Sequence, residues 1–192
     1  MRQAITVGIL VLAAALARGG RLASAVTIGT FVDVPNIPGE ATFPPVAGQI
    51  QAISFTWGVT QAKATRYGTA GVCSAGRSKP VFDGLCVLKH VDKASPKLFL
   101  AAAQGTVLQT VTISTWDTDL AAATQPLSKY ELSNAIVSSI QQGAGQAGDP
   151  IPTEKVCLNF SKAKMTVSQT NTDGTIIDTV TAGFDACGKS AF

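Results

Sequence analysis

The sequence has few of the side chains from which active sites and metal centres are usually built. Among its 192 residues there is one histidine, His90, and the four cysteines are spread widely along the chain. A zinc site needs cysteine and histidine in close groups, and this sequence provides no such group. It also has no Gly-x-Gly-x-x-Gly run and no phosphate-binding glycine loop with a lysine. We therefore predict no metal and no cofactor.

Charge is also scarce. Charged residues make up 14% of the chain, and the formal net charge is +3. All 12 acidic residues lie beyond residue 25, together with 12 of the 15 basic ones, so that part of the chain is formally neutral. A nucleic-acid-binding protein is expected to carry a basic excess. We therefore expect no nucleic-acid partner. The hydrophobic content of 46% argues against a disordered chain.

Residues 1–25 have the pattern of an export signal. Arg2 precedes a 14-residue apolar run, Ala4–Ala17, and Ala23-Ser24-Ala25 is a small-x-small cleavage site. The run is short for a membrane span, which needs roughly 20 residues. Because two arginines follow it directly, an uncleaved anchor is the alternative. We expect cleavage near Ala25, a secreted or periplasmic protein without membrane contact after cleavage, and one domain over residues 26–192.

The four cysteines predict two disulfides, because an even number behind an export signal is typical of an oxidising compartment. They are Cys73, Cys86, Cys157 and Cys187. Three pairings are open, and we favour the pairing of sequence neighbours. Cys73 with Cys86 would close a glycine-containing loop. Cys157 with Cys187 would join the strands of a terminal hairpin. A turn at Asp173-Gly174 makes residues whose numbers sum to 347 face each other, and these two sum to 344, so they would be near-diagonal neighbours that one bulge would bring together. Four reduced thiols are the alternative if the export signal is not real.

Strand patterns dominate the remaining chain. Ile53, Phe55, Trp57 and Val59 alternate with small or polar residues, which predicts a half-buried strand. Further strands are predicted at 27–34, 81–90, 107–116, 130–140, 156–168 and 175–184. One helix is predicted at 96–104, with Ser95 as its N-cap and Gly105 as its C-terminal cap. So many strands with one helix predict a mainly β protein, a closed or nearly closed two-sheet β-barrel with one flanking α-helix.

Three weak candidates for chemistry remain. Ser74 is one place out of register with a Gly-x-Ser-x-Gly nucleophile elbow and would need His90 as its base. Asp117-Thr-Asp119 lacks the glycine and the bidentate glutamate of a calcium loop. Asp149 and Glu154 could act as paired carboxylates, but they lack the aromatic platform that a glycosidase would use. We interpret all of these as structural or surface groups and predict no catalytic residue.

Several stretches, in collinear order, resemble the hemolysin-coregulated protein family, Hcp, the tube protein of bacterial type VI secretion. Phe31–Glu40 resembles the opening strand of the family and its Gly-Glu turn, and Ile50–Gln61 resembles the next strand. Leu88–Leu98 resembles the strand-to-helix segment with its Asp-Lys-x-Ser-Pro sequence. Tyr130–Ile140 and Pro152–Lys162 resemble parts of the last third. Each short match is weak, whereas their joint order is specific.

The resemblance implies a two-sheet β-barrel with one helix, and a hexameric ring that stacks into a hollow tube whose lumen carries small effector proteins. It also implies that residues 60–80 help neighbouring subunits or rings to pair. We therefore expect a structural, self-associating protein and no enzyme, with itself, protein cargo or a secretion machine as partners. Since the export signal and disulfides depart from cytoplasmic members, we expect an exported Hcp-like variant. The alternatives are an exported monomeric Hcp-like binding module for an unknown ligand or partner and, far behind, a hydrolase using Ser74 or His90.

Overall fold

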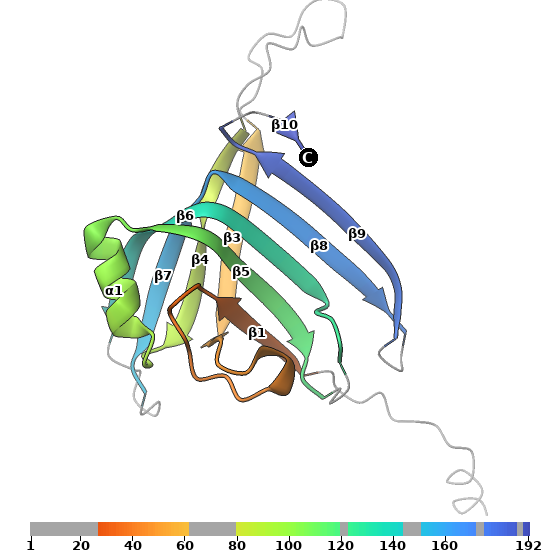
Figure 1. Cartoon of the computed structure of the whole chain (residues 1–192), viewed down its shortest axis with the longest axis horizontal. Helices are drawn as coiled ribbons and strands as arrows, with labels where there is room; N and C mark the ends of the chain where they lie inside the picture. The colour runs from red at the N-terminus through yellow and green to blue at the C-terminus, as the bar shows by residue number, and fades with distance from the viewer. Residues whose placement is uncertain (1–26, 62–79, 120–122, 144–150, 172–174, 188–189) are drawn as a thin grey trace, which may run out of the picture.

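The computed structural model describes residues 27–61, 80–119, 123–143, 151–171, 175–187 and 190–192 (Figure 1). These residues form ten strands, one short 3-10 helix and one α-helix, so the protein is mainly β, as predicted. The elements are β1 Ile28–Asp33, η1 Pro44–Val46, β2 Ile50–Ala52, β3 Ser54–Gln61, β4 Pro80–His90, α1 Ser95–Gln104, β5 Val107–Asp117, β6 Ser128–Gly143, β7 Thr153–Asn159, β8 Lys162–Thr170, β9 Ile176–Asp185 and β10 Ser190–Ala191.

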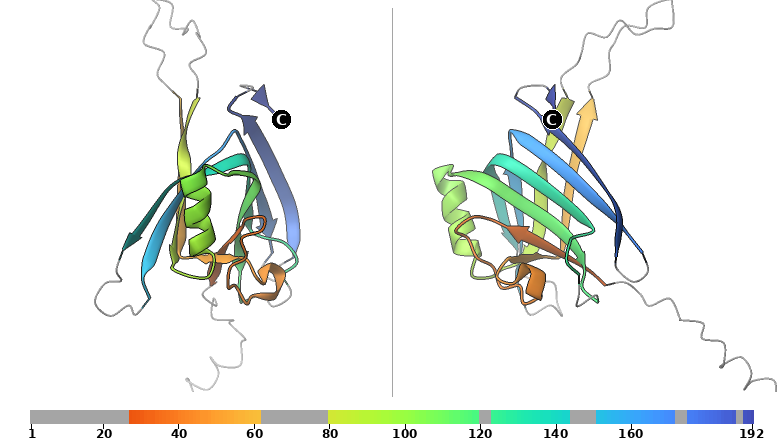
Figure 2. Two further views of the ribbon diagram at one scale, coloured as in Figure 1. Left: turned by 60° about the vertical axis from the view of Figure 1, so that its left-hand side comes forward. Right: turned by 45° about the vertical axis from the view of Figure 1, so that its right-hand side comes forward.

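The long strand β6 organises the sheet, because its two halves have different neighbours. Its first half lies between β5 and β8, and its second half pairs with β7. One path therefore runs β10-β9-β8-β6-β5-β1-β2, while a branch runs from β6 through β7 and β4 to β3. All of these ladders are antiparallel. Figure 2 shows that the two parts of the sheet lie against each other as two layers.

The sheet is not closed by hydrogen bonds in the part of the chain that is described. β2 pairs with β1 and β3 pairs with β4, and only Ile53 links β2 to β3 along the chain. No ladder joins β9 to β3 among these strands. The predicted closed barrel is therefore not confirmed, whereas the predicted mainly β fold with a single α-helix is.

The main core fills the space between the two layers. Its most buried members come from facing strands, with Leu85 on β4, Val111 and Ile113 on β5 and Ala135 on β6, each 0% exposed. Successive side chains of a strand point to opposite faces, so one row of each strand supplies the core. A second, smaller cluster packs Trp116 against Phe31 near η1.

Helix α1 follows the sequence signals closely. Pro96 occupies its first turn, and Gly105 ends it with a left-handed φ of 62°, as the predicted C-terminal cap requires. The predicted N-cap is wrong by one residue, because Ala94 holds that position and Ser95 is the first helical residue. No helix in the described residues is long and apolar enough to cross a membrane.

The terminal hairpin has the predicted register but a shorter first strand. From Lys162 opposite Asp185 to Gln169 opposite Asp178, the partners in β8 and β9 sum to 347, as predicted. The strand predicted at 156–168 is in fact two strands, β7 and β8, because the chain leaves the sheet after Asn159. β7 then pairs with β4 and β6, away from the hairpin.

Candidate functional site

A buried ion pair lies where β4 ends, α1 begins and β7 begins. Lys89 and Glu154 are each 1% exposed, and the Lys89 Nζ donates to Glu154 Oε1 at 2.7 Å. The same ammonium group donates to Asp92 Oδ1 and to the carbonyl oxygen of His90, both at 2.8 Å. Because three oxygens surround it, the amine has the partners that a buried ammonium group needs.

The carboxylate of Glu154 is held from both sides. The Ser95 hydroxyl donates to Oε1 at 2.7 Å, and Gln142 Nε2 donates to Oε2 at 2.8 Å. Burial alone would raise the pKa of Glu154, but the hydrogen bonds from Lys89, Gln142 and Ser95 outweigh it, so the pKa lies below its ordinary value. Lys89 is thus shared between the carboxylates of Glu154 and Asp92, and this network fixes the corner between β4, α1 and β7.

The other predicted candidates are not brought together. Ser74 and Asp149 lie outside the described residues. His90 ends β4, and its buried Nδ1 has no hydrogen-bond partner among the described residues. In Asp117-Thr-Asp119, one carboxylate accepts from the Asp119 amide at 3.0 Å and the other from the Thr27 amide at 2.9 Å. Within the described ranges, no three His, Cys, Asp or Glu side chains are placed to share a metal ion.

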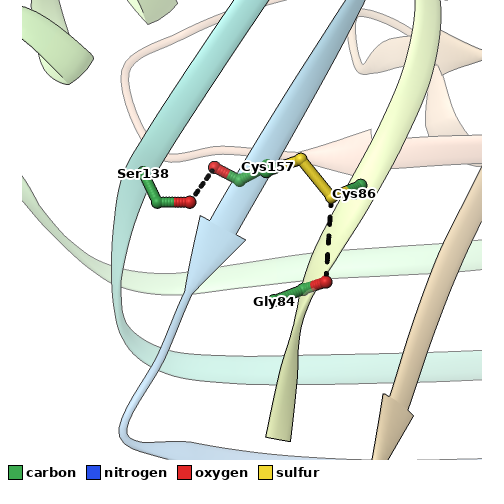
Figure 3. Close-up of a disulfide and its surroundings, with 4 residues drawn as sticks. All are labelled: Gly84, Cys86, Ser138 and Cys157. Atoms are coloured by element: carbon green, nitrogen blue, oxygen red, sulfur yellow. Dashed lines mark hydrogen bonds between the residues drawn. A yellow bond between two sulfur atoms is a disulfide. The ribbon is translucent and has the colours of Figure 1, made fainter.

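The disulfide differs from the favoured pairing. Cys86 on β4 is bonded to Cys157 on β7, its direct cross-strand partner, and the two Cα atoms are 4.0 Å apart (Figure 3). Cys187 is an exposed free thiol. Both favoured pairs, Cys73–Cys86 and Cys157–Cys187, are therefore wrong. The physical reason is the break after Asn159, which moves Cys157 from the terminal hairpin to the side of β4. Cys73 itself lies outside the described residues.

One exposed apolar group beside α1 was not found from the sequence. Phe99, Leu100 and Val107 are 64%, 51% and 57% exposed, and we call these three residues the helix patch. Leu98 and Ala101, on the other side of α1, are buried in the core. The sequence signal was present, because apolar residues cover more than one face of this helix. Such a patch of large apolar side chains is a candidate surface for protein contact.

A second apolar feature is a cleft of about 350 Å³ between two arms of the sheet. One wall is the β3–β4 arm, with Trp57 and Val59, and the other is the β8–β9 hairpin, with Met165 and Ala182. The arms meet where the rings of Phe82 and Phe184 lie 5.7 Å apart. Figures 1 and 2 show the arms separating from that end toward the far end of the hairpin. Among the described residues, no charged side chain lines the cleft.

Charge is divided unevenly between the body and one connection. The described residues contain seven lysines, no arginine and ten acidic residues, a formal charge of −3. Residues 62–79, which join β3 to β4, contain four basic residues and no acidic one. The formal net charge of the whole mature chain does not show this division. The positions of the charged residues in the sequence do show it.

Comparisons with known proteins agree with this fold. Residues 31–167 match the profile of the family described as type VI secretion system effector, Hcp. A solved structure described as that of a type six secretion system protein has a TM-score of 0.74 and 20% identity, covering 86% of this chain and all of that one. Hcp1 from Salmonella typhimurium has a TM-score of 0.68 and 22% identity, covering 86% and 99%.

A third structure, the secreted protein Hcp3 from Pseudomonas aeruginosa, has a TM-score of 0.57 and 17% identity, covering 84% of this chain and 98% of that one. Identities this low show a shared fold and no more. No curated protein matches the chain significantly. The family profile spans well over half of the sequence, and the chain therefore belongs to the Hcp family of type VI secretion proteins.

Proposed function

We propose that this protein is a structural, self-associating ring or tube component, exported from the cytoplasm, whose lumen hosts protein cargo. The observation that carries the proposal is the family match over residues 31–167, because Hcp proteins are structural parts of a secretion system. The corner around Lys89 agrees with this reading, since its charged groups are buried and paired with one another.

The helix patch supports self-association. Closing a ring requires a heterologous contact, in which one surface of a subunit meets a different surface of the next. Helix α1, which carries the exposed Phe99 and Leu100, lies at one side of the molecule, away from the β8–β9 hairpin (Figure 1). Burying such side chains against a neighbour contributes about 1.5–3 kcal/mol each when burial is complete. We therefore place one side of the subunit contact at this patch.

The charge division supports stacking of copies. The predicted pairing segment, residues 60–80, contains the four basic residues between β3 and β4. The exposed acidic residue Glu40 lies at the other end of the molecule, near Asp92, which follows the end of β4 and is paired with Lys89. Attraction between unlike ends would weaken as salt is added, because a Debye length of about 8 Å at physiological ionic strength screens exposed charges.

Export is proposed from the first 25 residues. The mature protein would begin near Val26, directly before β1, and would be secreted or periplasmic. The disulfide between Cys86 and Cys157 supports this location, because such bonds persist in oxidising compartments. Sequencing the amino terminus of the protein recovered from the periplasm or medium tests it. A terminus at Met1, or a purely cytoplasmic protein, would contradict export.

The ring is tested by the mass of purified Val26–Phe192, measured by light scattering over a range of concentrations under oxidising conditions. A six-fold mass is expected for the ring, and larger stacked assemblies should dissociate to that mass on raising the salt concentration. Phe99→Glu should lower the mass, because it puts a charge into the helix patch. Ile177→Glu is the matched control, since Ile177 is 56% exposed on β9 and should leave the mass unchanged. A monomer at every concentration would overturn the ring.

The second candidate function is an exported monomeric binding module. The observation that favours it is the uncharged cleft between the β3–β4 arm and the β8–β9 hairpin, which an isolated subunit leaves open. A monomer that binds a partner in this cleft would support it over the ring.

A further inference from the structure

The outer edge of β9 offers backbone groups to an additional strand. The Ala186 amide bonds Ser161 on the β8 side, whereas the Gly183 carbonyl accepts from Phe192 on the other side. Because alternate residues of a strand direct their backbone groups to opposite sides, Thr179 and Thr181 also direct theirs to the outer edge. The Thr179 amide bonds the carboxylate of Asp178 at 2.7 Å. Within the described residues, the Thr181 amide has no partner.

The end of the chain shows that this edge accepts a strand. β10 pairs antiparallel with β9 at only two positions, Ser190 with Asp185 and Ala191 with Phe184. The Phe192 amide then bonds the Gly183 carbonyl at 3.2 Å. A strand continuing from this point would lie opposite Ala182 and the residues before it. Natural edge strands are usually blunted by lysine, proline or a bulge. Between Asp178 and Gly183 there is no lysine and no proline, and the register shift lies beyond Asp178.

The face beside this edge is apolar and uncovered. Ala182 and Met165 line the cleft opposite Trp57 and Val59. Val180, on the same face two residues before Ala182, is 66% exposed. A strand added to β9 would direct every second side chain toward this cleft. The lack of charged side chains along the cleft favours an uncharged, apolar row of side chains.

We propose that the cleft binds an extended, uncharged apolar segment of another protein, which adds as a strand to the outer edge of β9. Backbone bonds to Thr179 and Thr181 would give the strand its register, and alternate side chains would fill the space between Trp57 and Ala182. This is the strand-addition mode of peptide recognition, in which the backbone gives affinity and the pockets give specificity. The site does not depend on ring formation, so its failure and the failure of the ring are separate results.

The test uses Val26–Phe192 and a short synthetic peptide that alternates valine and threonine and carries a lysine tail for solubility. Hydrogen exchange of single amides is followed by nuclear magnetic resonance. The Thr181 amide should exchange fast in the free protein and at least about ten-fold more slowly with saturating peptide, because a new backbone bond must open before exchange. No change at Thr181 with saturating peptide would overturn the proposal.

Two matched variants distinguish peptide binding in the cleft from non-specific peptide binding. Ala182→Asp places a charge in the cleft and should abolish the protection. Ile177→Asp places the same charge at an exposed position of β9 that does not line the cleft, and should retain the protection. Equal loss in both variants would overturn the role of the cleft. Extending the chain beyond Phe192 with the valine-threonine sequence should protect Thr181 within one chain and prevent peptide binding.

A second copy of the chain is the competing occupant. If Thr181 is protected without peptide, and the protection rises together with the measured mass, then a second copy fills the cleft and the proposal of a foreign segment is wrong. Protection that appears only with peptide, at constant mass, supports it.

Discussion

Two regions of the molecule differ in where they place polar groups. One is the corner between β4, α1 and β7, and the other is the β8–β9 hairpin. In the corner, Lys89 and Glu154 are 1% exposed and are bonded to each other and to neighbouring polar groups. In the hairpin, the pair Lys162–Asp185 lies at the surface, with the lysine side chain 44% exposed, and Val180 is 66% exposed. Buried charges tolerate few arrangements, whereas exposed ones tolerate many. The corner therefore specifies the fold, and the hairpin keeps a surface for contact.

The largest expected effect is the removal of one partner of the buried pair. Glu154→Ala should reduce the free energy of unfolding by about 3–5 kcal/mol, because it breaks the buried pair and leaves Lys89 with Asp92 as its remaining carboxylate partner. Urea unfolding of purified protein measures it. Glu131→Ala is the control, because Glu131 bonds the partly exposed Lys164 and should cost no more than about 1 kcal/mol. Equal losses would mean that burial does not distinguish the two regions.

Removing the disulfide should have the second-largest effect on stability. Cys86→Ala together with Cys157→Ala should reduce the free energy of unfolding by about 4 kcal/mol, because the bond closes a loop with a sequence separation of 71. Cys187→Ser, in the exposed turn after β9, should change it by no more than about 0.5 kcal/mol. Urea unfolding under oxidising conditions measures both variants. A large loss in the Cys187 variant would contradict the pairing described here.

The same substitution at two valines compares the regions directly. Val156 on β7 is 4% exposed and Val180 on β9 is 66% exposed. Val156→Thr should reduce the free energy of unfolding by about 1–3 kcal/mol, because it places a hydroxyl group in the core. Val180→Thr should stay within about 0.5 kcal/mol. Thermal unfolding ranks the two, and the comparison fails if Val180→Thr costs as much as Val156→Thr.

The pH dependence gives the smallest effect. The pKa of Glu154 is below its ordinary value in the folded protein, so the folded state binds this proton more weakly than the unfolded state. Its contribution to stability is complete above the ordinary pKa and is lost as the pH falls through the folded pKa. Stability should therefore rise with pH across this acidic window, and less steeply in Glu154→Gln. Equal slopes in unfolding experiments at several acidic pH values would contradict the shift.

Local sequence patterns predicted the features that are determined by residues close together in the chain. Gly105 could be recognised as a cap because a left-handed residue suits glycine. The register of β8 and β9 followed from the turn predicted at Asp173-Gly174, since a hairpin turn sets the pairing of its own strands. Both predictions are confirmed.

Partners that are distant along the chain could not be predicted in this way. Alternation tells which face of a strand is buried but does not tell which strand lies beside it. For this reason Cys157 was assigned to the wrong neighbour, and Glu154 was considered only as a possible pair with Asp149. Lys89 and Glu154 are 65 positions apart, and only the pairing of β4 with β7 brings them together. The resemblance to Hcp was the one sequence argument that related segments distant along the chain, and the family match confirms this resemblance.

The bond between Cys86 and Cys157 also has a mechanical consequence. A pulling force applied at the two termini would pass through the sulfur atoms and bypass the chain between them, which contains α1, β5, β6, the end of β4 and the start of β7. About 240 Å of extended chain would thus be withheld from stretching, at about 3.4 Å per residue. A subunit driven through a narrow passage could lose its terminal strands under load and still keep its central strands folded.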